Sequence, residues 1–306
     1  MLSLGLSDQL MAQDDIDLPM LVPTIVGQRN PNLTPPTPPS TPAPDEPAAV
    51  DERPGPENTG PKGELINQSG SINVTEDGAV IENIDLDGCI SVRANNVTIR
   101  NMRIDCGSFY AIRIYSEFEQ TLIEDVEMIN MTSSGVLGSN FTIRRSNIHD
   151  SGGDALKPGS DVVIESSWFH RLGTIEGSHS DGVQMTSGSN VRISGNFFDM
   201  PNVSGYTNSQ CIILQTNNGP VDNIVVENNW LNGGGWCVQV NDKGNGYGSP
   251  QNILIKDNQF GPDCQFGTIL VRGDNNDTTL INNVYEATGQ VIGEEITNDT
   301  CGNDFD

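Results

Sequence analysis

The stretch FTIRRSNIHDSGGDALKPGSDVVIESSWF, from Phe141 to Phe169, contains the pattern that decides the fold. It opens with FTIRRSNI and closes with VVIESSWF, and both segments alternate apolar and polar residues around a central isoleucine, Ile143 and Ile164. Period-two alternation is typical of a strand that buries one face. Between them, DALK from Asp154 predicts a second, shorter strand in the same repeat.

The same module recurs along the chain at spacings from 20 residues (Ile123 to Ile143) to 33 residues (Ile193 to Val226), which is the range expected of stacked repeats. The central residues are Ile99, Ile123, Ile143, Ile164, Ile193, Val226, Ile255 and Ile281. Short second strands follow most of them, at Ala111, Gly135, Asp154, Asp181, Cys211, Cys237 and Thr268.

One such coil cannot bury its apolar side alone, whereas a second coil stacked about 4.8 Å above it pairs the backbones and closes a core. The sequence therefore predicts an all-β fold, a right-handed parallel β-helix built from a single chain as a solenoid, over residues 64–296. Asn196, Asn229 and Asn258 share one repeat position and predict a stacked amide ladder.

The segments outside the solenoid differ in composition. Residues 1–30 carry scattered apolar residues and are predicted to be a short docking or disordered segment, the extended N-terminal part of the chain. Residues 31–63 are rich in proline, which predicts an extended, semi-rigid linker. Residues 297–306 form a C-terminal tail.

The net charge of −26 disfavours nucleic acid and anionic membranes as partners. We find no apolar stretch long enough to span a membrane and recognise no signal peptide. The six cysteines form no CxxC pair, which disfavours a zinc ribbon. Cys211 and Cys237 fall in apolar strands as expected of buried thiols, and Cys89 with Cys106 is a candidate disulfide that the sequence leaves open.

The coil pattern resembles the pectate-lyase-like right-handed parallel β-helix superfamily over roughly residues 65–295. Within it, GGDALKP (152–158), HSDGVQM (179–185) and NNWLNGGGW (228–236) resemble bacterial and phage β-helix proteins, among them polysaccharide lyases, epimerases, hydrolases and virion tailspikes. The signature of the pectin-hydrolysing glycosidases, Asn-Thr-Asp with a paired Asp-Asp, is not matched, and neither is the Asp-Pro-His-Asp or Asp-Pro-His-Glu signature of the alginate epimerases. The resemblance therefore implies the fold and a polysaccharide partner, but no individual catalytic role.

Candidate site residues concentrate between residues 149 and 184. All three histidines lie there, and alignment of the modules predicts that His149, His170 and Asp199 stack on successive coils, with Asp150 beside Arg171 at the next position. The second strands align Asp154 with Asp181 and Lys157 with Gln184, and we expect these side chains to point outward on the same face as the histidines.

Each residue also has a structural interpretation. The histidines fit stacked turn residues, the aspartates fit turn caps, and Lys157 fits an ion pair with an Asp on a neighbouring coil. The functional interpretation depends on their gathering on one face of a chain that is poor in His and Lys.

We consider three functions. A polysaccharide lyase acting on an acidic glycan would use Lys157 or Arg171 to neutralise the sugar carboxylate and His179 or His170 as the base. Asp181 completes this candidate catalytic set. Ca²⁺ held by Asp154 and Asp181 is a possible substitute for the cation, although no cofactor is required.

Candidate substrate contacts in this interpretation are Asp154, Gln184, His149 and Trp236.

The second function is a glycoside hydrolase with Asp154 and Asp181 as its carboxylate pair. The third is a non-enzymatic virion or cell-surface spike that binds glycan and assembles through residues 1–30. The resemblance to tailspikes implies a virion or extracellular location and a homotrimer.

Overall fold

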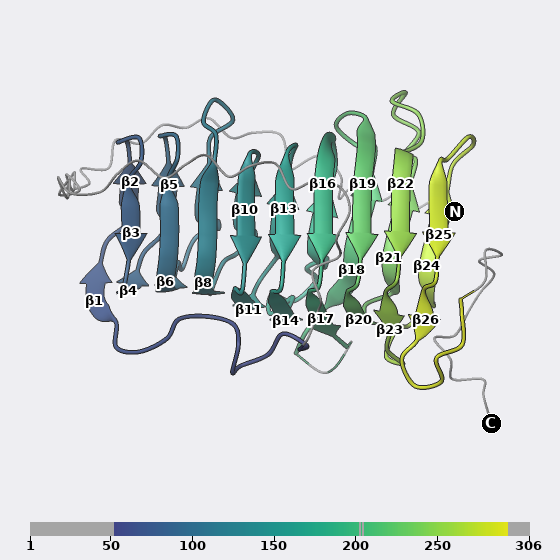
Figure 1. Ribbon diagram of the computed structural model, residues 1–306, viewed down its shortest axis with the longest axis horizontal. Coiled ribbons are helices and arrows are strands. Elements are labelled where there is room, and N and C mark those ends of the chain that lie inside the picture. The colour runs from purple at the N-terminus through teal and green to yellow at the C-terminus, as the bar shows by residue number, and fades with distance from the viewer. Residues whose placement is uncertain (1–51, 202, 204, 293–306) are drawn as a thin grey trace, which may run out of the picture.

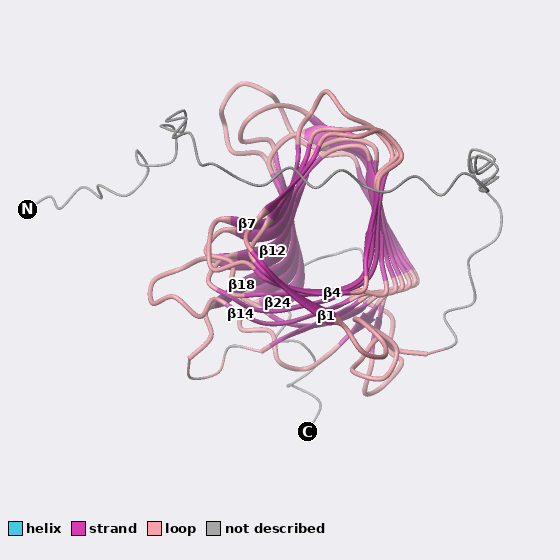
Figure 2. Cartoon of the chain, turned by 90° about the vertical axis from the view of Figure 1, so that its left-hand side faces the viewer, coloured by secondary structure: helices cyan, strands magenta, loops and turns pink. Residues whose placement is uncertain are grey.

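The computed structural model describes residues 52–201, 203 and 205–292, and this part of the chain forms 26 strands and no helix. The strands wind into a right-handed parallel β-helix, whose coils stack along the long axis in Figure 1 and enclose one core when viewed end-on in Figure 2. The predicted fold class is confirmed. The predicted segments 1–30 and 297–306 lie outside the described residues.

Three walls surround the core. The first wall contains β3 (Val80–Glu82), β6 (Thr98–Asp105), β8 (Thr121–Ile129), β10 (Phe141–Arg144), β13 (Val162–Glu165), β16 (Gly188–Ser194), β19 (Val221–Glu227), β22 (Gln251–Lys256) and β25 (Thr278–Ile281). The second wall contains β1 (Ile66–Ser69), β4 (Ile84–Asp87), β11 (Asn147–Ser151), β14 (Trp168–Leu172), β17 (Phe197–Met200), β20 (Trp230–Gly233), β23 (Gln259–Phe260) and β26 (Val284–Tyr285). Strands β6 and β8 continue from the first wall into the second, which joins both into one 17-stranded sheet.

The third wall is a separate nine-stranded sheet. It contains β2 (Ile72–Val74), β5 (Ile90–Val92), β7 (Tyr110–Ile114), β9 (Ser134–Gly138), β12 (Asp154–Pro158), β15 (Ser180–Met185), β18 (Asn208–Gln215), β21 (Trp236–Asn241) and β24 (Gly267–Arg272). Loops project from the corner between the second and third walls, at the lower left of Figure 2.

The core consists of columns of apolar side chains. Ile143 pairs with Ile164 and Ile164 with Ile193, and all three are fully buried, as the repeat predicted. The last predicted member is wrong by one residue. Ile255 pairs with Leu280, which packs against the core, while Ile281 is 43% exposed. Two adjacent apolar residues satisfied the pattern equally well, and only the register of β25 distinguishes them.

The asparagine ladder is confirmed and extends one coil further. The Asn196 side-chain amide donates to Asn229 Oδ1 (3.0 Å), Asn229 to Asn258 Oδ1 (3.0 Å) and Asn258 to Asn283 Oδ1 (2.9 Å). Each amide also donates to a backbone carbonyl of a neighbouring coil, so these buried polar groups are satisfied. The ladder locks the register of four successive coils.

The cysteines follow the expected pattern. Cys89 and Cys106 are joined by a disulfide that links two neighbouring coils. Cys211 and Cys237 are free and buried, as their apolar strands indicated.

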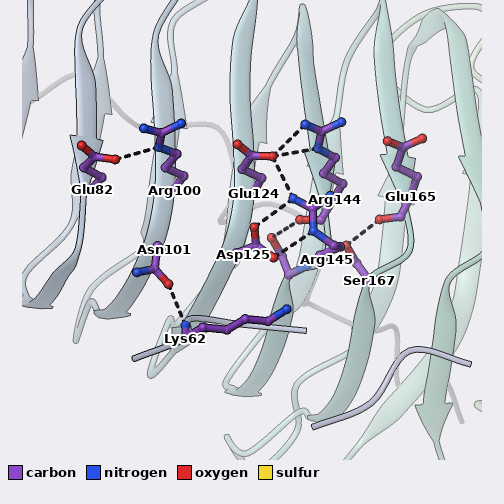
Figure 3. A network of polar contacts seen from close by, with 11 residues as sticks. Lys62, Glu82, Arg100, Asn101, Glu124, Asp125, Arg144, Arg145, Glu165 and Ser167 are labelled. Atoms are coloured by element: carbon purple, nitrogen blue, oxygen red, sulfur yellow. Dashed lines mark hydrogen bonds and ion pairs between the residues drawn. The ribbon is translucent and has the colours of Figure 1, made fainter. Parts of the chain in front are cut away.

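Charged side chains form rows on the outside of the first wall (Figure 3). Arg100 pairs with Glu82 at 2.7 Å, and Arg144 pairs with Glu124 at 2.7 Å. Arg145 contacts both Glu124 (2.9 Å) and Asp125 (2.8 Å). Because most of these side chains are partly exposed, each pair contributes little alone, and the row chiefly favours correct stacking of opposite charges.

Residues 52–62, the end of the predicted linker, lie along the outside of the solenoid, and we call them the strap (Figure 1). The backbone amide of Gly60 donates to the Arg145 carbonyl (2.8 Å), and that of Lys62 donates to Asn101 Oδ1 (2.6 Å). At the other end the Arg53 guanidinium lies over the Phe197 ring, with its Cζ 4.9 Å from the centroid. This part of the linker is therefore packed against the repeats.

No helix in the described residues has the length and apolarity to cross a membrane.

Candidate functional site

The structure divides the predicted site residues between two walls. His149, His170 and Arg171 belong to β11 and β14 of the second wall. Lys157 and Gln184 belong to β12 and β15 of the third wall, beyond the corner. The expectation that all of them share one face is wrong, because the chain changes direction between β11 and β12 and sequence spacing does not reveal that angle.

The residues of the first group occupy paired positions on neighbouring coils. His149 pairs with His170, and His170 with Asp199, as the alignment predicted. The two imidazole rings stack with centroids 4.7 Å apart, and the Trp168 indole stacks on His170 at 3.7 Å. Both histidines are buried, at 8% and 6% exposure.

Carboxylates and a guanidinium surround His149. Its Nε2 lies 2.9 Å from Glu127 Oε1 and its Nδ1 lies 2.7 Å from Asp150 Oδ2. Arg171 donates to Asp150 at 2.7 Å, which confirms that these two residues meet. The hydrogen bond from His149 is the main influence that lowers the pKa of Glu127, and desolvation partly opposes it.

His170 is different because it faces no carboxylate directly. Burial is the main cause that lowers its pKa to about 3, and the nearby His149 and Arg171 act in the same direction. The ring is therefore neutral, and its Nε2 lies 2.9 Å from Asn147 Oδ1, which can only accept a hydrogen bond. His149 and His170 therefore bond within the cluster, whereas the buried indole N–H of Trp168 has no hydrogen-bond partner among the described residues.

The second group is centred on two aspartates that the sequence placed outward. Asp154 and Asp181 are each only 2% exposed, so that expectation is wrong. The backbone amide of Asp181 donates to Asp154 Oδ1 (2.8 Å), and the amide of Gln210 donates to Asp181 Oδ1 (2.9 Å). Each carboxyl thus accepts a hydrogen bond from a backbone amide of the next coil, and this bond holds the carboxyl in its buried position.

Burial raises the pKa values of both carboxyls in this group. Desolvation raises the pKa of Asp181 well above its ordinary value, and the charge of Asp154 adds to the shift. Desolvation also raises the pKa of Asp154, while Lys157 opposes the change. Lys157 forms an ion pair with an Asp of its own strand and not of a neighbouring coil as expected: its Nζ lies 3.2 Å from Asp154 Oδ2, and it also donates to Ser133 Oγ (3.0 Å). A carboxyl whose pKa is raised keeps its proton to a higher pH and is therefore better suited to act as a general acid, which favours Asp181 over Asp154 for that role.

The proposed calcium ligands are Asp154 and Asp181 alone. Within residues 52–292, apart from the two undescribed positions, no group of three or more His, Cys, Asp or Glu side chains is arranged to hold a metal ion. Asp154 Oδ2 already faces the Lys157 ammonium. Two carboxyl groups that accept backbone amides offer a poor start for the six to eight oxygen ligands of Ca²⁺.

The remaining candidates lie around the aspartates. Gln184 donates from Nε2 to Asp181 Oδ2 (3.1 Å). His179 is exposed on the loop before β15, with Nδ1 3.4 Å from Ser209 Oγ. Trp236 is half-buried and shares a column with Asp181 through Gln210, because Asp181 pairs with Gln210 and Gln210 with Trp236.

Two residues near these groups escaped the sequence analysis. Glu127 bonds His149, and Gln210 links Asp181 to Trp236 in the third-wall column. Gln210 occupies the repeat position of Asp181, so extending that column by one coil would have found it. Glu127 pairs with Asn147, which is not a predicted site residue, so the columns of predicted residues do not lead to it.

No protein-family model and no curated protein matches the chain. Among solved structures it is similar to the catalytic domain of a GH87 α-1,3-glucanase variant in complex with nigerose, at 13% identity and a TM-score of 0.49, covering 74% of this chain and 55% of that one. It is also similar to the A-module of the Azotobacter vinelandii mannuronan C-5 epimerase AlgE4, at 14% identity and a TM-score of 0.39, covering 71% of this chain and 86% of that one. The chain thus spans about half the length of the glucanase domain that it matches. At these identities both similarities concern the fold.

Proposed function

We propose that this protein binds a polysaccharide lengthwise along the third wall. The observation that carries the proposal is the column of Asp181, Gln210 and Trp236, flanked by Gln184 and Lys157. It combines an indole, amides and an ammonium on successive coils of one rigid sheet.

The chemistry of this column suits sugars. An indole face packs on the apolar face of a pyranose, while amide side chains exchange hydrogen bonds with hydroxyl groups. Because coils repeat about every 4.8 Å, equivalent side chains recur along the solenoid and can meet successive units of a linear polymer. His149 and His170 on the second wall make hydrogen bonds to residues of their own cluster, so the proposal does not use them.

We propose further that the same wall cleaves an acidic glycan by β-elimination. Lys157 would neutralise the uronate carboxylate, and His179 would remove the C5 proton. Asp181, whose pKa is raised, would protonate the leaving oxygen as the C4–O bond breaks and a C4–C5 double bond forms. The exposure of His179 supports its role as the base, and the raised pKa of Asp181 supports its role as the acid.

A glycoside hydrolase with Asp154 and Asp181 is the second candidate, because Asp154 and Asp181 lie on adjacent coils and interact electrostatically. The pair would need one ionised and one neutral carboxyl, and the opposing influence of Lys157 on Asp154 supports such a division.

The resemblance to pectate-lyase-like and tailspike proteins suggests a virion-associated or extracellular protein, assembled as a homotrimer with residues 1–30 as its anchor. The Cys89–Cys106 disulfide supports an oxidising environment. Deletion of residues 1–30 should abolish incorporation into an assembly but leave the solenoid folded. Retained incorporation would contradict the anchor.

Binding is tested by affinity electrophoresis and calorimetry over a panel of neutral and acidic polysaccharides. Trp236→Ala should weaken binding about tenfold, since stacking surfaces often dominate such interfaces. Trp168→Ala on the second wall is the matched control and should retain affinity. Equal losses in the two variants would contradict the placement on the third wall.

Cleavage is tested on each polysaccharide that binds. Unsaturated products that absorb in the ultraviolet would identify a lyase, whereas new reducing ends without unsaturation would identify a hydrolase. Asp181→Asn should abolish either reaction. If no bound polysaccharide is cut, with or without added Ca²⁺, the protein is a binding protein.

A further inference from the structure

Two arginines of the third wall share one aromatic ring. The Cζ of Arg93 lies 3.7 Å from the centroid of the Tyr115 ring, and that of Arg113 lies 4.5 Å from it. Both arginines are exposed, and Tyr115 is half-buried. The ring thus fixes two guanidinium groups close together at the protein surface.

The strand alternation explains their position. Arg113 lies between the buried Ile112 and Ile114 of β7, and it therefore points out of the wall. Arg113 pairs with Leu137, and Leu137 pairs with Lys157. Arg113 consequently lies on the same wall as Lys157, two coils or about 10 Å nearer the first coil, and Arg93 lies one coil further in the same direction.

Their lack of acidic partners is unusual for this chain. Seven of the ten described arginines form an ion pair with a carboxylate, namely Arg53, Arg100, Arg103, Arg144, Arg145, Arg171 and Arg192. Among the described residues, Arg93 and Arg113 have no carboxylate within ion-pair distance, although the chain carries 41 acidic residues against 15 basic ones. Two like charges on one ring repel each other, and an anion bound between them would relieve that repulsion.

We infer that Arg93, Tyr115 and Arg113 form a subsite for an anionic group of the glycan, a carboxylate or a sulfate ester. This inference rests on the proposed polysaccharide-binding function and assigns its ligand to the acidic class. Guanidinium groups suit the role because they bind planar oxyanions through paired hydrogen bonds. Lys157 is less available, because Asp154 already balances its charge.

The subsite also gives the wall a direction. Arg93 and Arg113 lie at the coils of β5 and β7, whereas Trp236 lies on β21, which is six strands from β5 and five from β7 in the nine-stranded sheet. A bound chain would therefore place an acidic unit near Arg113 and stack another sugar on Trp236.

The experiment measures binding of oligosaccharides in three matched forms, neutral, uronate and sulfated, by calorimetry at low and moderate salt. The double variant Arg93→Gln with Arg113→Gln should bind the acidic form about tenfold more weakly than the native protein, with a smaller salt dependence. Binding of the neutral form should not change. Arg100→Gln is the matched control, because it removes one charge from the first wall and leaves this wall intact.

Preference for the uronate would identify a carboxylate as the ligand, and preference for the sulfated form would identify a sulfate ester. Acidic binding that is unchanged in the double variant would overturn the subsite while glycan binding stands. Failure of the native protein to bind any form would overturn the subsite and the proposed function together. Arg113→Gln alone, with circular dichroism of each variant, separates loss of the subsite from loss of the fold.

Discussion

The imidazole rings of His149 and His170 stack across neighbouring coils, yet only His149 contacts carboxylates, Glu127 and Asp150. Stacked side chains thus occupy the same repeat position but experience different electrostatic surroundings. Such differences make the solenoid sensitive to pH.

Acidification should destabilise the protein through His170. Its folded-state pKa of about 3 lies below the ordinary value of 6.5, so between these values the unfolded chain binds more protons. We expect this residue to reduce the free energy of unfolding by on the order of 2 to 3 kcal/mol between about pH 7 and about pH 4. Urea denaturation of the native protein and of His170→Gln checks this, because the variant should show a weaker pH dependence. Identical slopes would contradict the neutral, buried imidazole.

Asp181→Asn should preserve or increase stability at neutral pH. The folded-state pKa of Asp181 is raised, so the folded chain binds more protons above the unfolded value and stability falls as pH rises through that window. Asparagine removes this dependence and still accepts the Gln210 amide. Asp181→Ala, by contrast, should lose about 1 to 3 kcal/mol because the Gln210 amide loses its acceptor. Thermal denaturation at two pH values compares the variants, and a large loss in Asp181→Asn would show that the carboxylate is held ionised.

Asn229→Ala should be among the most damaging single changes in the ladder. It leaves the Asn196 amide without its acceptor and removes the acceptor of the Asn196 backbone amide, at a cost of about 2 to 4 kcal/mol. The exposed Asn223, which donates to Asn190 and has a backbone φ of 56°, provides a matched control. Asn223→Gly removes the side chain without straining that left-handed backbone and should cost less than about 1 kcal/mol. Chemical denaturation measures both changes. Similar costs would mean that water replaces the buried ladder.

Removal of the Cys89–Cys106 disulfide should lower stability by about 3 kcal/mol, from the closure of a loop with a sequence separation of 17. The double variant Cys89→Ala with Cys106→Ala avoids an unpaired thiol. Its melting temperature should be lower than that of the native protein, and a reductant should not lower it further by breaking this disulfide. An unchanged melting temperature would indicate that stacking alone orders the first coils.

The sequence contained enough information for the stacking but not for the angles between walls. Ile143, Ile164 and Ile193 were identifiable because strand alternation and coil period both apply to them. The separation of His149 from Lys157 was not, since it depends on the corner between β11 and β12. The pattern also could not choose between Leu280 and Ile281, which are equally apolar.

The sequence predicted which residues belong to the candidate site, but the predicted exposure of its aspartates was wrong. Lys157 forms an ion pair, but with Asp154 of its own strand instead of an Asp on a neighbouring coil. The burial of Asp154 and Asp181 follows from backbone amides of the next coil, which a side-chain pattern does not contain. The arginine pair at Tyr115 was not predicted either, because its shared ring and its lack of carboxylate partners are visible only in the folded structure.

The strap changes how a tower of repeats should come apart. In an ordinary array each layer touches only the layers above and below, so fraying can proceed from either end independently. Here Arg53 joins Glu286 near the last coil, whereas Lys62 joins Asn101 near the first. Unfolding of the last coils must therefore also release the strap, which contacts the first coils, so the unfolding of the two ends of the solenoid is coupled.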